Sequence, residues 1–262
     1  MEEYFISKVS VFNLFNVEKL YSKGALKGKI SLRTFKMLNR PMVYRKISRT
    51  VHEKDISMIY LHGGPKVNYL PRYNHLISEL ATIGDLYYLD YTSENKGNIL
   101  DNGNFTNRID ISLEEIYKFS KSIKSKKNIL IGESYGAYLA FLSAINHQFL
   151  WSNVVLISPL FSIKNMKKRI KTNMMKEFII SSKSIKIVQN AIMKNDDLRF
   201  TIVHSMNDYI IPYAESLVAY EYLVRKKFEN IEMYLFEGDS HYDMFAINKY
   251  FLPKLVLQIL EE

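Results

Sequence analysis

A serine between two glycines is the first feature of the sequence that could do chemistry. Residues 132–136 read Gly-Glu-Ser-Tyr-Gly, after an apolar stretch and before a helix-forming one. Glycines at this spacing allow a tight strand-to-helix turn, which lifts the serine hydroxyl clear of the backbone at the helix N-terminus. We therefore predict that Ser134 is a nucleophile and that the backbone N–H of Tyr135 faces a developing oxyanion.

A serine hydroxyl needs a general base, and His241 fits that role better than the other histidines. In the chain order serine, acid, histidine, the base follows the last strand, and His241 comes shortly after the apolar residues 231–236. We predict that His241 takes the proton from Ser134. The other histidines follow an early strand, lie in loops or helices, or end the strand before the acid: His52, His62, His75, His147 and His204.

Two aspartates compete to orient this imidazole. Asp208 lies in the loop after the apolar residues 200–204, where the chain order places the acid, whereas Asp239 is only two residues before His241. Because Asp239 is only two residues before His241 on a tight loop, we do not expect its carboxylate to reach the far nitrogen of the His241 ring. We predict that Asp208 accepts the imidazole N–H and fixes its tautomer.

The sequence His-Gly-Gly-Pro at residues 62–65 follows an apolar run at residues 56–61. The loop after such a strand supplies a second oxyanion N–H, and glycine lets the backbone approach a ligand closely. Either Gly63 or Gly64 is the predicted donor, and the sequence leaves both open.

The elements that must position these residues follow from hydrophobic periodicity and turn signals. Extended pieces are predicted at residues 5–15, 30–37 and 42–47. Ser112 and Glu115 have the spacing of a capping box, so a helix is predicted to start at Ser112. Beyond residue 56, strands are predicted at 56–61, 86–91, 128–131, 154–157, 200–204 and 231–236, and helices at 73–83, 112–123, 137–145 and 242–260.

This alternation predicts an α/β fold with a mostly parallel central sheet that is flanked by helices. We expect one domain over residues 1–262, because α/β domains often reach this length. The alternation stops between residues 160 and 198, where helical or irregular signals and many lysines occur. There we predict a small helical cap over the carboxyl edge of the sheet, where ligands of open α/β sheets bind.

Together, the four motifs resemble those of the α/β-hydrolase superfamily over residues 40–262. His-Gly-Gly-Pro is similar to the motif of proline iminopeptidases and prolyl oligopeptidase-type peptidases, although Lys66 follows the proline here. The Asp-x-x-x-Pro step at residues 208–212 is similar to that of the oligopeptidase branch. Glu-Ser-Tyr-Gly resembles the motif of serine carboxypeptidases, whose glutamate helps to hold a substrate carboxylate. The resemblance implies a serine hydrolase, in which we assign Glu133 and His62 to substrate binding.

The expected reaction passes through an acyl-enzyme formed on Ser134 from a small peptide, an amide or an ester, with no metal or organic cofactor. A thioesterase or acyltransferase that acts on a carrier-bound acyl or peptidyl group is the alternative, because water exclusion rather than the triad separates hydrolysis from transfer. A non-catalytic binding protein on the same fold is the second alternative. The intact set of serine, aspartate and histidine argues against it.

The composition limits the possible scaffold, cellular location and partners of this protein. The absence of cysteine excludes a disulfide scaffold and a cysteine nucleophile. No apolar run approaches the ~20 residues of a membrane span, and the acidic start lacks a secretory pattern, so the cytoplasm is the expected location. The net charge is +9, which the Lys-, Ile-, Asn- and Tyr-rich composition explains without a charged partner. The expected partner is a small-molecule or peptide substrate, with an acidic carrier protein as the alternative and no nucleic acid. Lysines and an arginine are concentrated in the predicted cap: Lys164, Lys167, Lys168, Arg169, Lys171, Lys176, Lys183 and Lys186.

Overall fold

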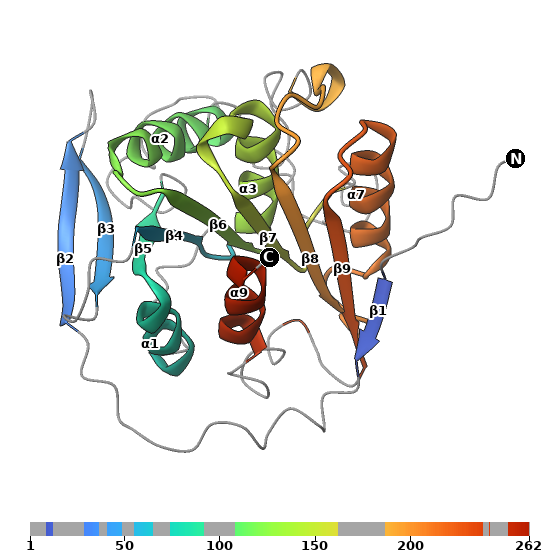
Figure 1. The fold of residues 1–262 in the computed structure, drawn as a ribbon, viewed down its shortest axis with the longest axis horizontal. Coiled ribbons are helices and arrows are strands. Elements are labelled where there is room, and N and C mark those ends of the chain that lie inside the picture. The colour runs from blue at the N-terminus through green and yellow to red at the C-terminus, as the bar shows by residue number, and fades with distance from the viewer. Residues whose placement is uncertain are drawn as a thin grey trace, which may run out of the picture.

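A twisted sheet with helices on both faces organises the protein (Figure 1). The structure is a computed structural model, and it describes residues 9–12, 29–36, 41–48, 55–64, 74–91, 108–161, 187–237, 241 and 251–261. The described strands are β1 (Val9–Phe12), β2 (Lys29–Lys36), β3 (Pro41–Ser48), β4 (Ile56–Leu61), β5 (Asp85–Asp90), β6 (Lys127–Glu133), β7 (Asn153–Ile157), β8 (Arg199–Ser205) and β9 (Ile231–Phe236). The helices are α1 (Asn74–Ile83), α2 (Arg108–Ser122), α3 (Tyr135–Asn146), α7 (Ala214–Arg225) and α9 (Phe251–Glu261), with the short 3-10 helix η4 (Gln148–Leu150).

The strand order brings the predicted site loops to one edge. Across the sheet the order is β1-β9-β8-β7-β6-β4-β5-β3-β2. Every pairing from β1 to β5 is parallel, and only β3 pairs antiparallel, with β5 and with β2. Parallel strands of one sheet end at the same edge, so the loops after β4, β6, β8 and β9 meet there. This arrangement confirms the predicted α/β fold with a mostly parallel sheet.

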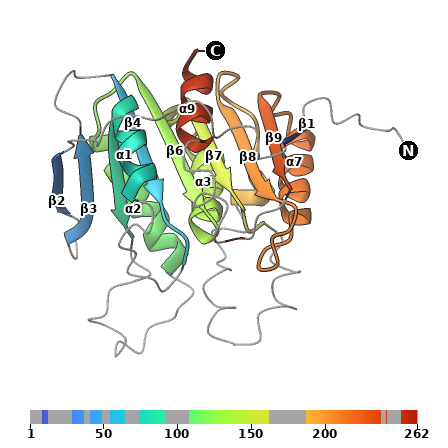
Figure 2. The same ribbon diagram turned by 90° about the horizontal axis from the view of Figure 1, so that it is seen from below.

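The central strands are apolar along their length because they are buried on both faces. In β4, Ile59 and Leu61 join the cluster that contains α2, α3 and α7, whereas Met58 and Tyr60 join the cluster of α1 and α9. Figures 1 and 2 show the same division, with α1 and α9 on one face of the sheet and the other three helices on the opposite face. Full burial of one such aliphatic side chain contributes about 1.5–3 kcal/mol. Packing on both faces thus fixes the strands whose ends carry the site.

The prediction that α2 starts at Ser112 was wrong. The helix begins at Arg108, and Ser112 lies within it as a fully buried residue. The apolar face starts earlier, because Ile109 and Leu113 are already buried against the core, so packing rather than a serine cap sets the start. Helix α7, a further difference, had no counterpart among the predicted elements.

The predicted cap and the predicted last helix fall partly outside the described residues. The predicted cap between residues 160 and 198 includes residues 162–186, which are not described, so the cap stays a prediction. Residues 242–250 of the predicted last helix are also outside, and α9 covers its remainder. Among the helices that the structure describes, none is both long and apolar enough to span a lipid bilayer.

Candidate active site

Ser134 stands at a strained turn between β6 and α3. Its φ of 54° and ψ of −116° lie outside the regions that non-glycine residues usually adopt, and it occupies the N-cap position of α3. Hydrogen bonds hold it there: its N–H donates to the Ile157 carbonyl at 2.8 Å, and its own carbonyl accepts from the N–H groups of Ala137 and Tyr138. Backbone strain maintained by its surroundings is characteristic of functional sites.

The two glycines of the motif are required by close backbone contacts. A Cβ at Gly132 would clash with the Gly136 carbonyl oxygen, and one at Gly136 would clash with the carbonyl oxygens of Leu61 and His62. Because these atoms are backbone, they have little room to move. The glycines therefore let α3 start directly against the end of β4.

The loop after β4 runs beside the serine. A Cβ added to Gly63 would lie 3.3 Å from the Ser134 Cβ, whereas Gly64 has a φ of 154°, which favours glycine. These positions agree with a backbone donor near the nucleophile, and the choice between Gly63 and Gly64 stays open. Tyr135, the other predicted donor, is buried as the first residue of α3.

His62 is placed as a support of this loop. Its side chain is buried, and its ring stacks on Tyr91 at 4.4 Å between centroids and on Tyr88 at 5.7 Å. The Tyr91 hydroxyl donates to the His62 carbonyl oxygen, and Nδ1 of His62 lies 2.6 Å from the Gly63 carbonyl oxygen. These contacts fix the loop that carries the glycines. Substrate binding by His62 stays a prediction.

Glu133, the other predicted substrate contact, is half-buried beside the same loop. Its Oε2 accepts a hydrogen bond from the Tyr60 hydroxyl at 2.9 Å. Its carboxyl carbon lies 3.9 Å from the position that a Cβ of Gly63 would take. The carboxylate therefore borders the loop after β4, and its role toward a substrate stays a prediction.

Asp208 and His241 meet although 33 residues separate them. The Nδ1 of His241 donates to Oδ2 of Asp208 at 2.6 Å. The other carboxylate oxygen, Oδ1, accepts from the backbone N–H groups of Ile210 at 2.9 Å and Ile211 at 2.8 Å. Neither side chain is more than 5% exposed. The loops after β8 and β9 thus form the aspartate–histidine pair that the sequence predicted, and Asp239 lies outside the described residues.

Electrostatics keep this aspartate ionised. Burial raises the pKa of Asp208, but hydrogen bonds from His204 and His241, the charge of His241 and the Ile211 N–H together hold that pKa far below its usual value. An ionised carboxylate is what the orienting acid of an imidazole base must be.

His204 was assigned no role from the sequence, yet its Nε2 lies 3.2 Å from the Asp208 Oδ2. The sequence signal that could have identified His204 is its position at the end of β8, directly before the loop that carries Asp208. Tyr60 and Tyr91, which hold Glu133 and the His62 loop, lay in the predicted strands as ordinary core residues. The hydrogen bonds of these two hydroxyls depend on how neighbouring strands and loops meet in space, which hydrophobic periodicity does not predict.

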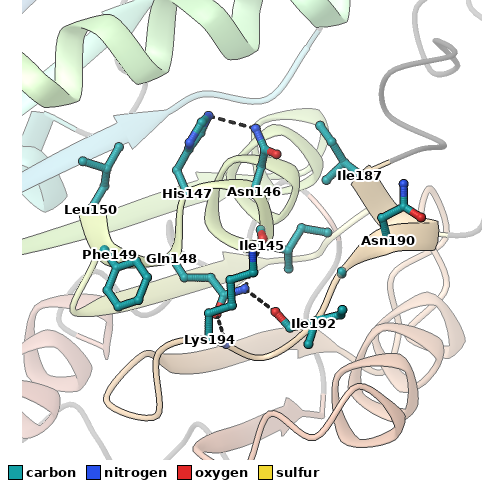
Figure 3. A pocket seen from close by; sticks show the side chains of 11 residues that line it. Ile145, Asn146, His147, Gln148, Phe149, Leu150, Ile187, Asn190, Ile192 and Lys194 are labelled. Carbon is teal, nitrogen blue, oxygen red and sulfur yellow. Dashed lines mark hydrogen bonds between the residues drawn. The ribbon is translucent and has the colours of Figure 1, made fainter.

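A separate cavity of about 560 Å³ opens at the other end of α3 (Figure 3). Ser134 precedes the first residue of α3, whereas this cavity begins at Ile145, about 16 Å further along the helix at 1.5 Å per residue. It therefore does not belong to the site around Ser134. Its lining consists of Ile145, Asn146, His147, Gln148, Phe149, Leu150, Ile187, Asn190, Ala191, Ile192 and Lys194.

Residues 112–254 match the model of the prolyl oligopeptidase family, which is more than half of the sequence. The chain belongs to this family of serine hydrolases. The match includes the segments that carry Ser134, Asp208 and His241. A comparison with curated proteins found no match.

Solved structures share the fold at low sequence identity. An acylaminoacyl peptidase in complex with Z-Gly-Gly-Phe-chloromethyl ketone has 17% identity over 90% of this chain and a TM-score of 0.68. This chain covers only 41% of that peptidase. Est1E from Butyrivibrio proteoclasticus with bound ferulic acid has 15% identity over 88% of this chain and 100% of its own, with a TM-score of 0.69. Alpha/beta hydrolase domain-containing protein 10 from mouse has 14% identity, covers 88% of this chain and 98% of its own, and gives a TM-score of 0.64. The fold is therefore the α/β-hydrolase fold.

Proposed function

We propose that the chain hydrolyses an acyl compound through a covalent intermediate on Ser134, with His241 as general base and Asp208 as the orienting acid. The observation that carries this proposal is the 2.6 Å hydrogen bond from His241 to the buried, ionised Asp208. It lies at the sheet edge where the strained turn presents Ser134. A hydrogen on Nδ1 leaves Nε2 of His241 as the proton acceptor, which a serine nucleophile needs.

The reaction has two halves. In the first, the Ser134 Oγ attacks the carbonyl carbon while His241 takes its proton, and the N–H groups of Tyr135 and of Gly63 or Gly64 bind the oxyanion. His241 then gives the proton to the leaving group. In the second half, His241 activates a water molecule that releases the acyl group and restores the hydroxyl.

The proposed substrate is a small peptide, an amide or an ester. Two similar folds support this choice, because one is a peptidase bound to a peptide chloromethyl ketone and the other binds ferulic acid. The position of Glu133 beside the loop after β4 supports a polar contact on the substrate. Transfer to or from an acidic carrier protein is the second candidate, favoured by the lysine-rich sequence between residues 164 and 186.

A matched pair of substrates tests the covalent intermediate. An ester and an anilide that share one acyl group must give the same acyl-enzyme, so their deacylation rates must agree even when their acylation rates differ. We expect rapid-quench intact-mass spectra to show one added acyl group per chain, and expect the mass shift to disappear in Ser134→Ala. Turnover of either substrate by Ser134→Ala at the wild-type rate would refute the proposal.

A further inference from the structure

Asp208 has a second imidazole beside it. His204, in β8, is fully buried, and its Nε2 lies 3.2 Å from Oδ2 of Asp208, the same oxygen that accepts from His241. The Nε2 of His204 also lies 2.8 Å from the Ile211 carbonyl oxygen. On the other side of the ring, Nδ1 lies 2.6 Å from the hydroxyl of Ser216 in α7.

These partners place a hydrogen on Nε2 of His204. A carbonyl oxygen only accepts, so the contact with Ile211 requires the hydrogen on Nε2, where Asp208 shares it. The Ser216 hydroxyl can then donate to Nδ1. The Nε2–H of His204 therefore donates to the Ile211 carbonyl oxygen and lies beside the Asp208 carboxylate.

Among the described residues, the hydrogen bonds and ion pairs of His204 and Asp208 involve no charged side chain apart from His241 and these two residues themselves. The titratable partner of His204 there is Asp208, and those of Asp208 are His204 and His241. Glu215 of α7 is buried next to Ser216 and accepts from the Phe161 backbone N–H at 3.3 Å. Asp208 thus accepts two backbone N–H groups at Oδ1 and the His241 N–H at Oδ2, and Nε2 of His204 lies 3.2 Å from the same Oδ2.

We propose that His204 is a positioning residue that acts through Asp208 and keeps His241 in its neutral, base-competent form to lower pH. The inference rests on the proposed function of Asp208 and His241. A donor at Oδ2 stabilises the negative charge of the carboxylate and reduces what that oxygen offers to a protonated His241. Without this donor the imidazolium gains stability, so protonation of His241 occurs at higher pH.

The expected shift in the pH dependence is small because the contact between His204 and Asp208 is long and the same N–H also faces the Ile211 carbonyl oxygen. Hydrogen bonds weaken with distance, and 3.2 Å is at the long end of the range for N–H to oxygen. We expect removal of the donor to move the acid limb of kcat/KM to higher pH by about 0.5–1 unit. That limb reports protonation of the base in the free enzyme.

Three variants at one position separate positioning from packing. His204→Met fills a similar volume without a donor. His204→Gln retains an N–H near the place of Nε2, whereas His204→Asn places its amide near Nδ1 and serves as the donor-free variant if His204→Met does not fold. The measurements are the titration of the His241 ring by 15N–1H NMR, kcat/KM against pH per active site, and thermal melting.

The inference predicts that the His241 ring titrates at higher pH in His204→Met or His204→Asn, with a matching displacement of the acid limb, and near-wild-type values in His204→Gln. An unchanged titration of His241 in a folded donor-free variant would overturn it, even if melting temperature fell. So would a glutamine variant that behaves like methionine. The NMR titration reads His241 with or without turnover, so an inactive wild-type protein would refute the proposed function without hiding the result for His204.

Discussion

Replacing Asp208 by asparagine should slow catalysis without preventing folding, and the hydrogen bonds around the carboxylate predict how. Oδ1 accepts from two backbone N–H groups, so the amide oxygen of asparagine must occupy that place. The amide NH2 then faces the Nδ1 of His241, where Oδ2 stood at 2.6 Å. A donor at this point forces Nδ1 to accept, which moves the ring hydrogen to Nε2 and removes the acceptor for the serine proton.

The expected loss is up to ~10⁴ in kcat, or about 5 kcal/mol of transition-state stabilisation. A steady-state assay with an ester, normalised to the folded fraction, measures it. Asp239→Asn is the control, since Asp239 was the rival acid in the sequence. A mild effect of Asp208→Asn with a severe effect of Asp239→Asn would show that the wrong carboxylate carries the role.

The same variant should change the pH dependence of stability. Because the folded pKa of Asp208 is lowered, its contribution is complete above the ordinary carboxyl pKa of ~3.9 and is lost as pH falls toward the folded value. The difference in unfolding free energy between wild type and Asp208→Asn should therefore narrow as the pH falls below about 4. Urea unfolding at several pH values measures it, and a difference that widens below pH 4 would contradict the assigned direction.

Three further predictions concern two glycines and the lysine-rich segment. Gly136→Ala should lower the unfolding free energy by about 1–3 kcal/mol or more, since the clash with the backbone of Leu61 and His62 outweighs the ~1 kcal/mol gain in helix propensity. Gly63→Ala meets the Ser134 Cβ instead, at 3.3 Å, so kcat should fall with little change in melting temperature, and the reverse pattern would contradict this geometry. If an acidic partner docks on the lysine-rich segment, charge reversal should slow its association in a salt-dependent way and leave a small neutral ester unaffected. The charge-reversal variant combines Lys167→Glu, Lys168→Glu and Lys171→Glu. If it changes the turnover of neutral and anionic substrates equally at low salt, the lysine-rich segment does not dock an acidic partner.

Sequence patterns predicted the central strands of the sheet well because each of them is a short, continuous apolar run. The runs at residues 56–61 and 231–236 coincide with β4 and β9, since strands buried on both faces must be apolar throughout. Helix starts were harder. A capping-box spacing at Ser112 competed with an apolar face that begins at Ile109, and tertiary packing decided the boundary.

Chain order alone led to the pairing of Asp208 with His241, and the catalytic roles of both residues stay predictions. The hydrogen bond between His241 and Asp208 agrees with the order serine, acid, histidine. The supporting contacts were not predictable in this way. The contact of His204 with Asp208 depends on how the chain turns after β8, and the contact of Tyr91 with the His62 carbonyl depends on how the loop after β4 meets the end of β5.

A site-mapped labelling experiment tests the role of Ser134 most directly. A fluorophosphonate reacts with an activated serine, and mass spectrometry of the digested protein locates the adduct. Ser158→Ala is a matched control, because Ser158 also has a positive φ, of 45°, and directly follows the neighbouring strand β7. We predict one adduct per chain on Ser134, which is retained in Ser158→Ala and lost in Ser134→Ala. An adduct that persists in folded Ser134→Ala, or that maps to another serine in the wild type, would contradict the account.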